Sequence, residues 1–142
     1  MKEEKNFKDS MFKAMKSLGN TLPIILGTIL LFSLIITIIP KSFYLSIFNN
    51  SIFDPILGSL VGSISAGNPI TSYILGGEFL EQGVGLMAVT AFLVAWVTVG
   101  VIQLPAESII LGKKFAILRN LTSFIFAMIV AILTITILEV FL

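Results

Sequence analysis

Residues 58–78 read GSLVGSISAGNPITSYILGGE, and this stretch decides the fold. It is rich in small and polar residues, although strongly apolar segments lie on both sides of it. Asn68-Pro69 at its centre interrupts a helix, because proline lacks an N–H group and restricts the residue before it. The apolar pieces 55–66 and 70–75 are each too short to cross a bilayer, which takes about 20 helical residues. They predict a re-entrant broken-helix hairpin over 55–77, or a discontinuous helix.

The composition places this stretch in an all-α integral membrane protein with a single domain over residues 1–142. The chain is 56% hydrophobic and 12% charged, with a mean hydropathy of +1.05, whereas about a quarter of the residues of a soluble domain are charged. It has no cysteine and no histidine, which excludes disulfides and thiolate or imidazole metal ligands. We therefore expect no metal and no cofactor.

Three apolar runs outside the central stretch predict full transmembrane helices, over 21–39, 86–104 and 121–142. The first would be roughly 28 Å long at about 1.5 Å per residue, which matches the hydrocarbon core. Pro23 is expected in the first turn of that helix, where its missing N–H costs nothing. Residues 1–20 carry five lysines, and Phe7, Met11, Met15 and Leu18 recur at helical spacing. This pattern predicts an N-terminal interfacial helix, with a frayed, charged tail as the alternative.

The distribution of basic residues predicts the topology. Eight of the nine lie within residues 1–20 and 113–119, and the positive-inside rule places both segments in the cytoplasm. The chain is then a multi-pass protein of the cell membrane with a cytoplasmic N-terminus. Lys41 and Glu78 fall on the outer side, so the stretch between them re-enters from outside or crosses twice. The shortness of its two pieces favours re-entry, with the 65–69 turn inside the membrane.

The central stretch has two interpretations. Gly58, Gly62 and Ala66 are four residues apart, a spacing that lets helix backbones approach closely in a packing seam without a ligand. The second interpretation is a solute-binding site. The break leaves backbone N–H and C=O groups without helical partners, and lipid cannot satisfy them. Helix N-termini at such a point attract anions. Asn68 is expected to be the N-cap of the second half-helix, with Pro69 at its first position. The candidate solute-binding residues here are Ser63, Ser65, Gly67, Asn68, Pro69 and Thr71.

A second set of candidate solute-binding residues, Gln103 and Glu107, follows the 86–104 span. A carboxylate near the end of a membrane helix is either interfacial or functional. Pro105-Ala106-Glu107 also fits the first turn of a new helix, where the helix dipole favours an acidic side chain. Trp96 is expected to pack in the protein or to face lipid.

The run from Leu57 to Glu107 resembles one half of the predicted permeases related to the methylarsenite efflux permease. Four features carry the resemblance. They are Leu57-Gly58, the small-residue turn from Ser63 to Pro69, Gly83, and Ala91-Phe92-Leu93. Members of that family often carry cysteines in this turn, and soft thiolates are natural ligands of trivalent arsenic. This chain has serines there, so the resemblance does not imply arsenic chemistry. Family members also contain two such halves, and this chain has one, which implies a homodimer or a paired half-subunit.

These observations predict a small permease subunit that moves a polar or anionic solute through the broken-helix turn. The alternative is a structural or accessory membrane protein whose small-residue helix face docks a partner without transport. An enzyme is not expected, because the sequence has no phosphate-binding glycine loop, nucleophile elbow or catalytic acid pair. Basic residues are too few for nucleic acid. The expected partners are the lipid bilayer, a second subunit and a small polar solute.

Overall fold

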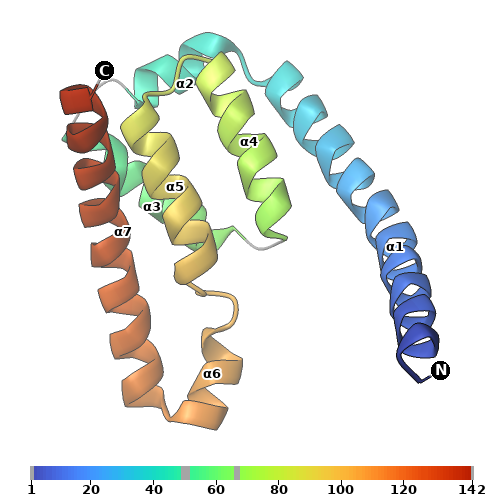
Figure 1. The fold of residues 1–142 in the computed structure, drawn as a ribbon. Coiled ribbons are helices and arrows are strands. Elements are labelled where there is room, and N and C mark those ends of the chain that lie inside the picture. The colour runs from blue at the N-terminus through green and yellow to red at the C-terminus, as the bar shows by residue number, and fades with distance from the viewer. Residues whose placement is uncertain (1, 49–51, 66–67, 142) are drawn as a thin grey trace. The chain divides into compact units, whose positions relative to one another are not determined.

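The computed structural model of this protein describes residues 2–48, 52–65 and 68–141, and these residues form helices without any strand. The prediction of an all-α protein is therefore confirmed. The chain divides into two compact units, residues 1–38 and 39–142 (Figure 1). The first holds α1 (Lys2–Ile38), and the second holds α2 (Lys41–Ile47), α3 (Asp54–Ile64), α4 (Pro69–Glu81), α5 (Leu86–Thr98), α6 (Leu104–Leu111) and α7 (Lys113–Phe141).

The first unit is one continuous helix of 37 residues, roughly 55 Å at about 1.5 Å per residue. The interfacial helix expected over 1–20 is thus not separate from the span expected over 21–39, and this boundary is corrected. The helix runs through the junction, where the Thr21 hydroxyl donates to the Ser17 carbonyl oxygen at 2.8 Å. Pro23 lies inside the helix rather than in its first turn. Its missing N–H therefore deprives the Gly19 carbonyl of a helical donor.

In the second unit, α3 and α4 run in opposite directions on either side of α5 (Figure 1). Both helices pack against α5, and within the described chain they share no helix–helix contact with each other. Aromatic rings connect α2, α4 and α5. The Tyr44 ring of α2 lies 6.1 Å from the Phe79 ring of α4, and the Phe79 ring lies 5.3 Å from the Phe92 ring of α5. The two halves of the interrupted stretch are thus held together through α5.

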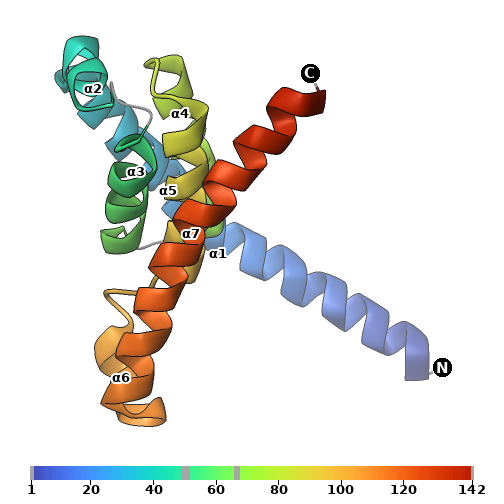
Figure 2. The same cartoon turned by 90° about the vertical axis from the view of Figure 1, so that its left-hand side faces the viewer.

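The α3 and α5 helices run parallel, with their backbones in direct contact. A Cβ atom added to Gly58 would overlap the Ala88 carbonyl oxygen, and one added to Gly62 would overlap the Phe92 carbonyl oxygen. The partners advance four residues along each helix, which defines a parallel register. Gly58 and Gly62 therefore form a packing seam, while Ala66 lies outside the described residues. This seam aligns the C-terminal ends of α3 and α5 (Figure 2).

The helix expected over 86–104 is interrupted, and this length is corrected. α5 has 13 residues, about 20 Å at 1.5 Å per residue, and residues 99–103 separate it from α6. Pro105 explains the interruption. In a continuous helix it would remove the bond to the Val101 carbonyl, whereas in the first turn of α6 its missing N–H costs nothing. The first-turn positions predicted for Pro105 and Glu107 are confirmed.

The last helix, α7, begins earlier than the span expected over 121–142. Gly112, with φ of +87°, makes the turn from α6 into α7, so residues 113–120 belong to this helix. Among the described residues, two helices are long and apolar enough to cross a membrane. They are Phe7–Ile35 within α1 and Lys113–Phe141, which is α7.

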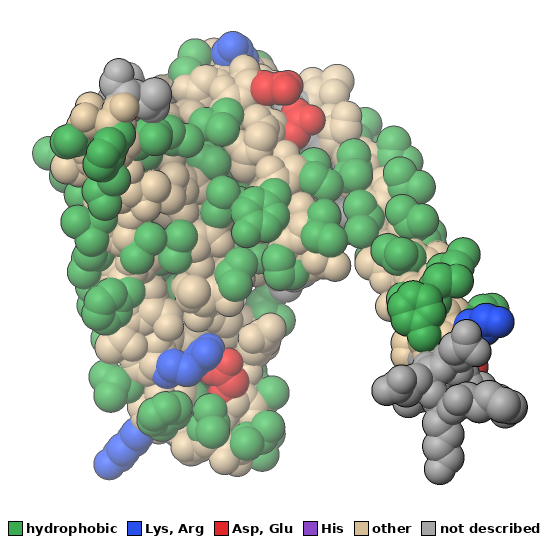
Figure 3. Space-filling view, in the orientation of Figure 1, with side chains coloured by type: hydrophobic (Ala, Val, Ile, Leu, Met, Phe, Trp, Pro, Cys, Tyr) green, Lys and Arg blue, Asp and Glu red, His purple; other side chains and the backbone are tan. Residues whose placement is uncertain are grey.

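The charged side chains of the second unit gather toward its two ends, with apolar side chains over the surface between them (Figure 3). At one end the Lys41 ammonium donates to the Glu81 carbonyl oxygen at 3.5 Å, and Asp54 and Glu139 line one cavity of about 390 Å³. At the other end α6 turns into α7. We call the first the acidic end (Lys41, Asp54, Glu78, Glu81, Glu139) and the second the basic end (Glu107, Lys113, Lys114, Arg119).

Candidate functional site

The two interruptions of the helices meet at one cavity of about 140 Å³. The first break, residues 65–68, separates α3 from α4, and the second break, residues 99–103, separates α5 from α6. The cavity brings Ser65 of the first break against the end of α5 and the second break. Its described lining residues are Ser65, Trp96, Val97, Val99, Gly100, Ile102 and Gln103. Two of the predicted candidates, Ser65 and Gln103, are thus brought together.

At the first break, Asn68 is the N-cap of α4, as predicted. Its side-chain oxygen Oδ1 accepts from the Ile70 N–H at 2.9 Å, and its carbonyl oxygen accepts from the Thr71 N–H at 2.9 Å. Pro69 follows it at the start of α4 and has no N–H. Among the first three residues of α4, Pro69 therefore has no N–H, and the N–H groups of Ile70 and Thr71 each have an acceptor. These N–H groups are therefore not free to donate to an anion.

The serine hydroxyls beside the first break donate into their own helix. Ser63 Oγ donates to the Leu60 carbonyl at 2.8 Å, and Ser65 Oγ donates to the Val61 carbonyl at 2.7 Å. Each hydroxyl oxygen keeps its lone pairs, so Ser65 can serve the cavity as an acceptor. Ser63 and Thr71 are buried and are not among the described lining residues. Gly67 lies outside the described residues.

The second break is held by Asn120 of α7. Asn120 is 5% exposed, and its Oδ1 accepts from the Gly100 N–H at 2.8 Å. In an unbroken helix this N–H would donate to the Trp96 carbonyl four residues earlier. Asn120 thus replaces a helical bond and leaves the Trp96 carbonyl without its helical donor. The distance between the two partners in sequence is 20 residues.

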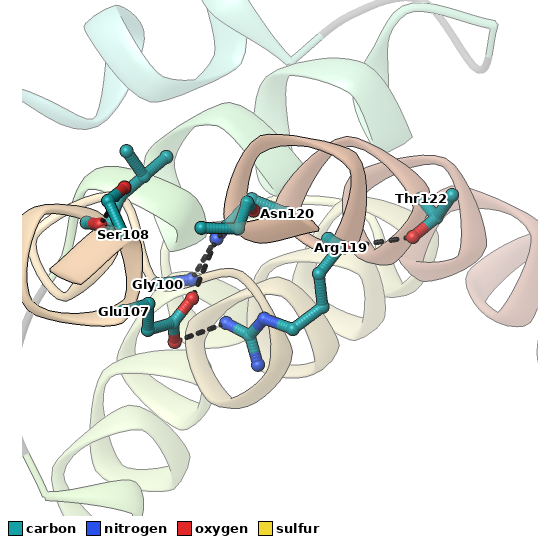
Figure 4. Close-up of polar contacts among 8 residues, drawn as sticks. Gly100, Glu107, Ser108, Arg119, Asn120 and Thr122 are labelled. Atoms are coloured by element: carbon teal, nitrogen blue, oxygen red, sulfur yellow. Dashed lines mark hydrogen bonds and ion pairs between the residues drawn. The ribbon is translucent and has the colours of Figure 1, made fainter. Parts of the chain in front are cut away.

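Glu107 extends this network to α6 (Figure 4). Its Oε1 accepts from Arg119 Nη2 at 2.6 Å, and its Oε2 accepts from Asn120 Nδ2 at 3.1 Å. The same Nδ2 donates to the Ala116 carbonyl at 3.0 Å. We call Gly100, Glu107, Arg119 and Asn120 the polar clamp. Glu107 therefore joins α6 to α7 and is not among the described lining residues of the cavity, where it was a candidate.

Trp96 is one of the lining residues, but its indole N–H is enclosed by the protein. The side chain is 8% exposed, and its Nε1 has no hydrogen-bond partner among the described residues. The ring packs edge-on against Phe92, with centroids 5.4 Å apart, at the end of the aromatic series that begins at Phe43. A buried N–H without a partner costs about 1–3 kcal/mol.

The expected packing of Trp96 is confirmed, because the side chain is 8% exposed and its ring packs against Phe92. Sequence reasoning missed Gly100, Arg119 and Asn120 as parts of the polar clamp. One signal pointed to this group, because Asn120 is an uncharged polar residue directly before the apolar run 121–142. That signal does not identify its partner Gly100, which lies 20 residues earlier in the chain.

No protein-family model, curated protein or solved structure matches this chain.

Proposed function

We propose that this protein is a small membrane permease subunit that moves a small polar solute through the cavity where the two breaks meet. The convergence of both breaks on one cavity carries the proposal. Interrupted helices are tolerated at membrane depth where they are buried in protein or line a cavity. Transporters build solute sites from such discontinuous helices. Ser65 and Gln103 supply the polar side chains of this site.

In this proposal the protein is a multi-pass protein of the cell membrane. α1 and α7 span the bilayer, α5 and α6 together form a discontinuous third span, and α3–α4 re-enters from the acidic end. α3 has 11 residues, roughly 16 Å, or about half of a hydrocarbon core of roughly 30 Å. The first break then reaches the middle of the membrane. The basic end and the N-terminal lysines face the cytoplasm.

We further propose that the subunit works as a homodimer or with a paired half-subunit. The chain contains one hairpin and one discontinuous helix, and the permeases it resembles contain two such halves. A pair of half-subunits related by symmetry would supply the second half of a permeation path.

The alternative, an accessory protein that docks a partner through its small-residue helix face, has less support. Gly58 and Gly62 already pack against the Ala88 and Phe92 carbonyls of α5 in the same chain. A partner helix would have to displace α5 to use this face.

Solute flux in proteoliposomes tests the permease proposal. The probes are a panel of small labelled polar solutes. Ser65→Leu would place a larger, apolar side chain at the cavity and remove its hydroxyl oxygen, so we expect flux to fall about tenfold or more. The control is Thr134→Leu on an exposed face of α7, where the hydroxyl bonds only to its own helix, at the Val130 carbonyl.

Two results would contradict the proposal. One is that no solute of the panel moves faster than in protein-free liposomes. The other is that Ser65→Leu and Thr134→Leu leave the same flux as the unsubstituted protein.

A further inference from the structure

The turn from α6 into α7 exposes apolar and basic side chains together. All seven residues from 109 to 115 are exposed, and we call this segment the basic-apolar turn. Four of the seven are large and apolar, and two are lysines: Ile109, Ile110, Leu111 and Phe115, with Lys113 and Lys114. On the face shown in Figure 3, hydrophobic side chains lie beside the Lys and Arg side chains of this end.

The protein leaves the apolar part of this turn uncovered. Ile109 and Ile110 are 86% and 80% exposed. α6 has no buried residue, and among the described helices it contacts α7 alone. Large apolar side chains are costly to leave in water, so this surface requires an apolar medium. The acyl chains of a bilayer meet that requirement.

The two lysines have no acidic side chain to balance them. The basic end holds one carboxylate, Glu107, and it is paired with Arg119 at 2.6 Å. Neither Lys113 nor Lys114 forms an ion pair within the part of the chain that the structure describes. The turn therefore keeps two positive charges beside its apolar side chains.

The position of these lysines at the start of α7 also favours a negative neighbour. The N-terminus of a helix carries a partial positive charge, which favours acidic side chains there. The first turn of α7 has no acidic residue, and it has two lysines instead. An anionic group beside Lys113 and Lys114 would offset their repulsion by the helix dipole.

An anionic phospholipid supplies both the acyl chains and the negative charge, whereas a soluble phosphate would leave the apolar side chains uncovered. Lysine can bury its methylene groups in the apolar region while its ammonium reaches the headgroups. We infer that the basic-apolar turn binds anionic phospholipids of the cytoplasmic leaflet in preference to zwitterionic ones, through Lys113 and Lys114. The positive-inside rule concerns orientation and requires no such preference. The inference rests on the bilayer placement within the proposed function, but not on transport.

The acidic end provides an internal control. Its one lysine, Lys41, lies among four acidic residues, and the Lys41 ammonium donates to the Glu81 carbonyl oxygen. Lys41→Gln therefore removes one positive charge from the same unit of the chain without altering the basic-apolar turn.

Quenching of a fluorophore on the turn by brominated lipid tests the inference. The chain has no cysteine, so Ile110→Cys can carry one bimane label at an exposed position. The full chain is reconstituted in bilayers of phosphatidylcholine and phosphatidylglycerol, with one of the two lipids brominated in its acyl chains. Quenching as a function of the lipid ratio gives the relative affinity of the two lipids at the label.

We expect phosphatidylglycerol to be preferred at least about fivefold, a difference of about 1 kcal/mol, because each lysine near an anionic surface contributes about that much. Lys113→Gln together with Lys114→Gln should reduce the preference to less than about twofold, whereas Lys41→Gln should retain it. The preference should also fall as salt rises from about 0.01 M to about 1 M, because the Debye length shortens from about 30 Å to about 3 Å.

The outcomes separate this inference from the permease proposal. Equal quenching by the two lipids would overturn the inference and keep the turn in the bilayer. A preference that survives both lysine substitutions, or that salt does not change, would overturn its assignment to the charges of Lys113 and Lys114. Absence of quenching by either lipid would overturn both the inference and the proposed bilayer placement. Flux is measured separately, so a failure of transport leaves the lipid preference intact.

Discussion

The two breaks differ in how the chain stabilises them. At the first break, every described bond joins residues within four positions of each other: Ser65 bonds to Val61, and Asn68 bonds to Ile70 and Thr71. At the second break, the Gly100 N–H depends on Asn120, 20 residues later, and Glu107 depends on Arg119, 12 residues later. The first break is a local feature of the sequence, and the second exists through α7.

This difference assigns separate roles to the two sides of the cavity. The capped start of α4 can form before the helices pack, because an N-cap needs only its neighbours. The second break needs α7 in place, because Asn120 supplies the acceptor of the Gly100 N–H. The glycine seam between α3 and α5 aligns the two breaks.

The largest expected effect comes from the seam that brings the breaks together. Gly62→Ala places a Cβ against the Phe92 carbonyl. A backbone carbonyl cannot move aside as a flexible side chain can, so the cost should reach the upper end of the overpacking range, about 3 kcal/mol. Gly77→Ala is the matched control, since nothing lies within 4 Å of a Cβ at Gly77. It should be neutral or stabilising by up to about 1 kcal/mol, because alanine favours the helix. Denaturation of both variants in mixed micelles measures the difference, and equal stabilities would refute a close α3–α5 seam.

A somewhat smaller effect is expected at the long-range break. Asn120→Ala leaves the Gly100 N–H without its acceptor and Glu107 Oε2 without its donor, which should destabilise the protein by about 2 kcal/mol. Thr122→Ala on the same helix should change stability by less than about 0.5 kcal/mol, because this hydroxyl bonds only within α7.

Amide hydrogen exchange distinguishes loss of the clamp from general destabilisation. Exchange at residues 99–103 should rise more in Asn120→Ala than exchange at residues 70–71 of the first break. A uniform rise across both breaks would remove the distinction between them.

The smallest effect is expected at the local break. Asn68→Ala removes the N-cap of α4 and should cost about 1 kcal/mol, whereas Asn68→Ser retains a capping oxygen and should cost only a few tenths. Thermal unfolding followed by circular dichroism gives both values. If the serine variant is as unstable as the alanine variant, Asn68 acts through its amide group rather than as a cap.

Local features were predicted correctly. Asn68 as N-cap, Pro69 at the start of α4, and Pro105 with Glu107 in the first turn of α6 all follow from the chemistry of one helical turn. The same local reasoning failed at Pro23, because a long helix can absorb a single proline. The continuity of α1 was therefore not visible in the sequence.

By itself the sequence determined that the protein is helical and apolar, that its central stretch is interrupted at Asn68-Pro69, and that another helix starts near Pro105. These properties depend on composition and on neighbours within a turn. Only the tertiary structure decided that Ser65 of the first break and residues of the second break line one cavity, and that Asn120 holds the second break. Such contacts arise because Gly58 and Gly62 let α3 approach the backbone of α5 in parallel register, and no local pattern specifies which helix will fill that seam.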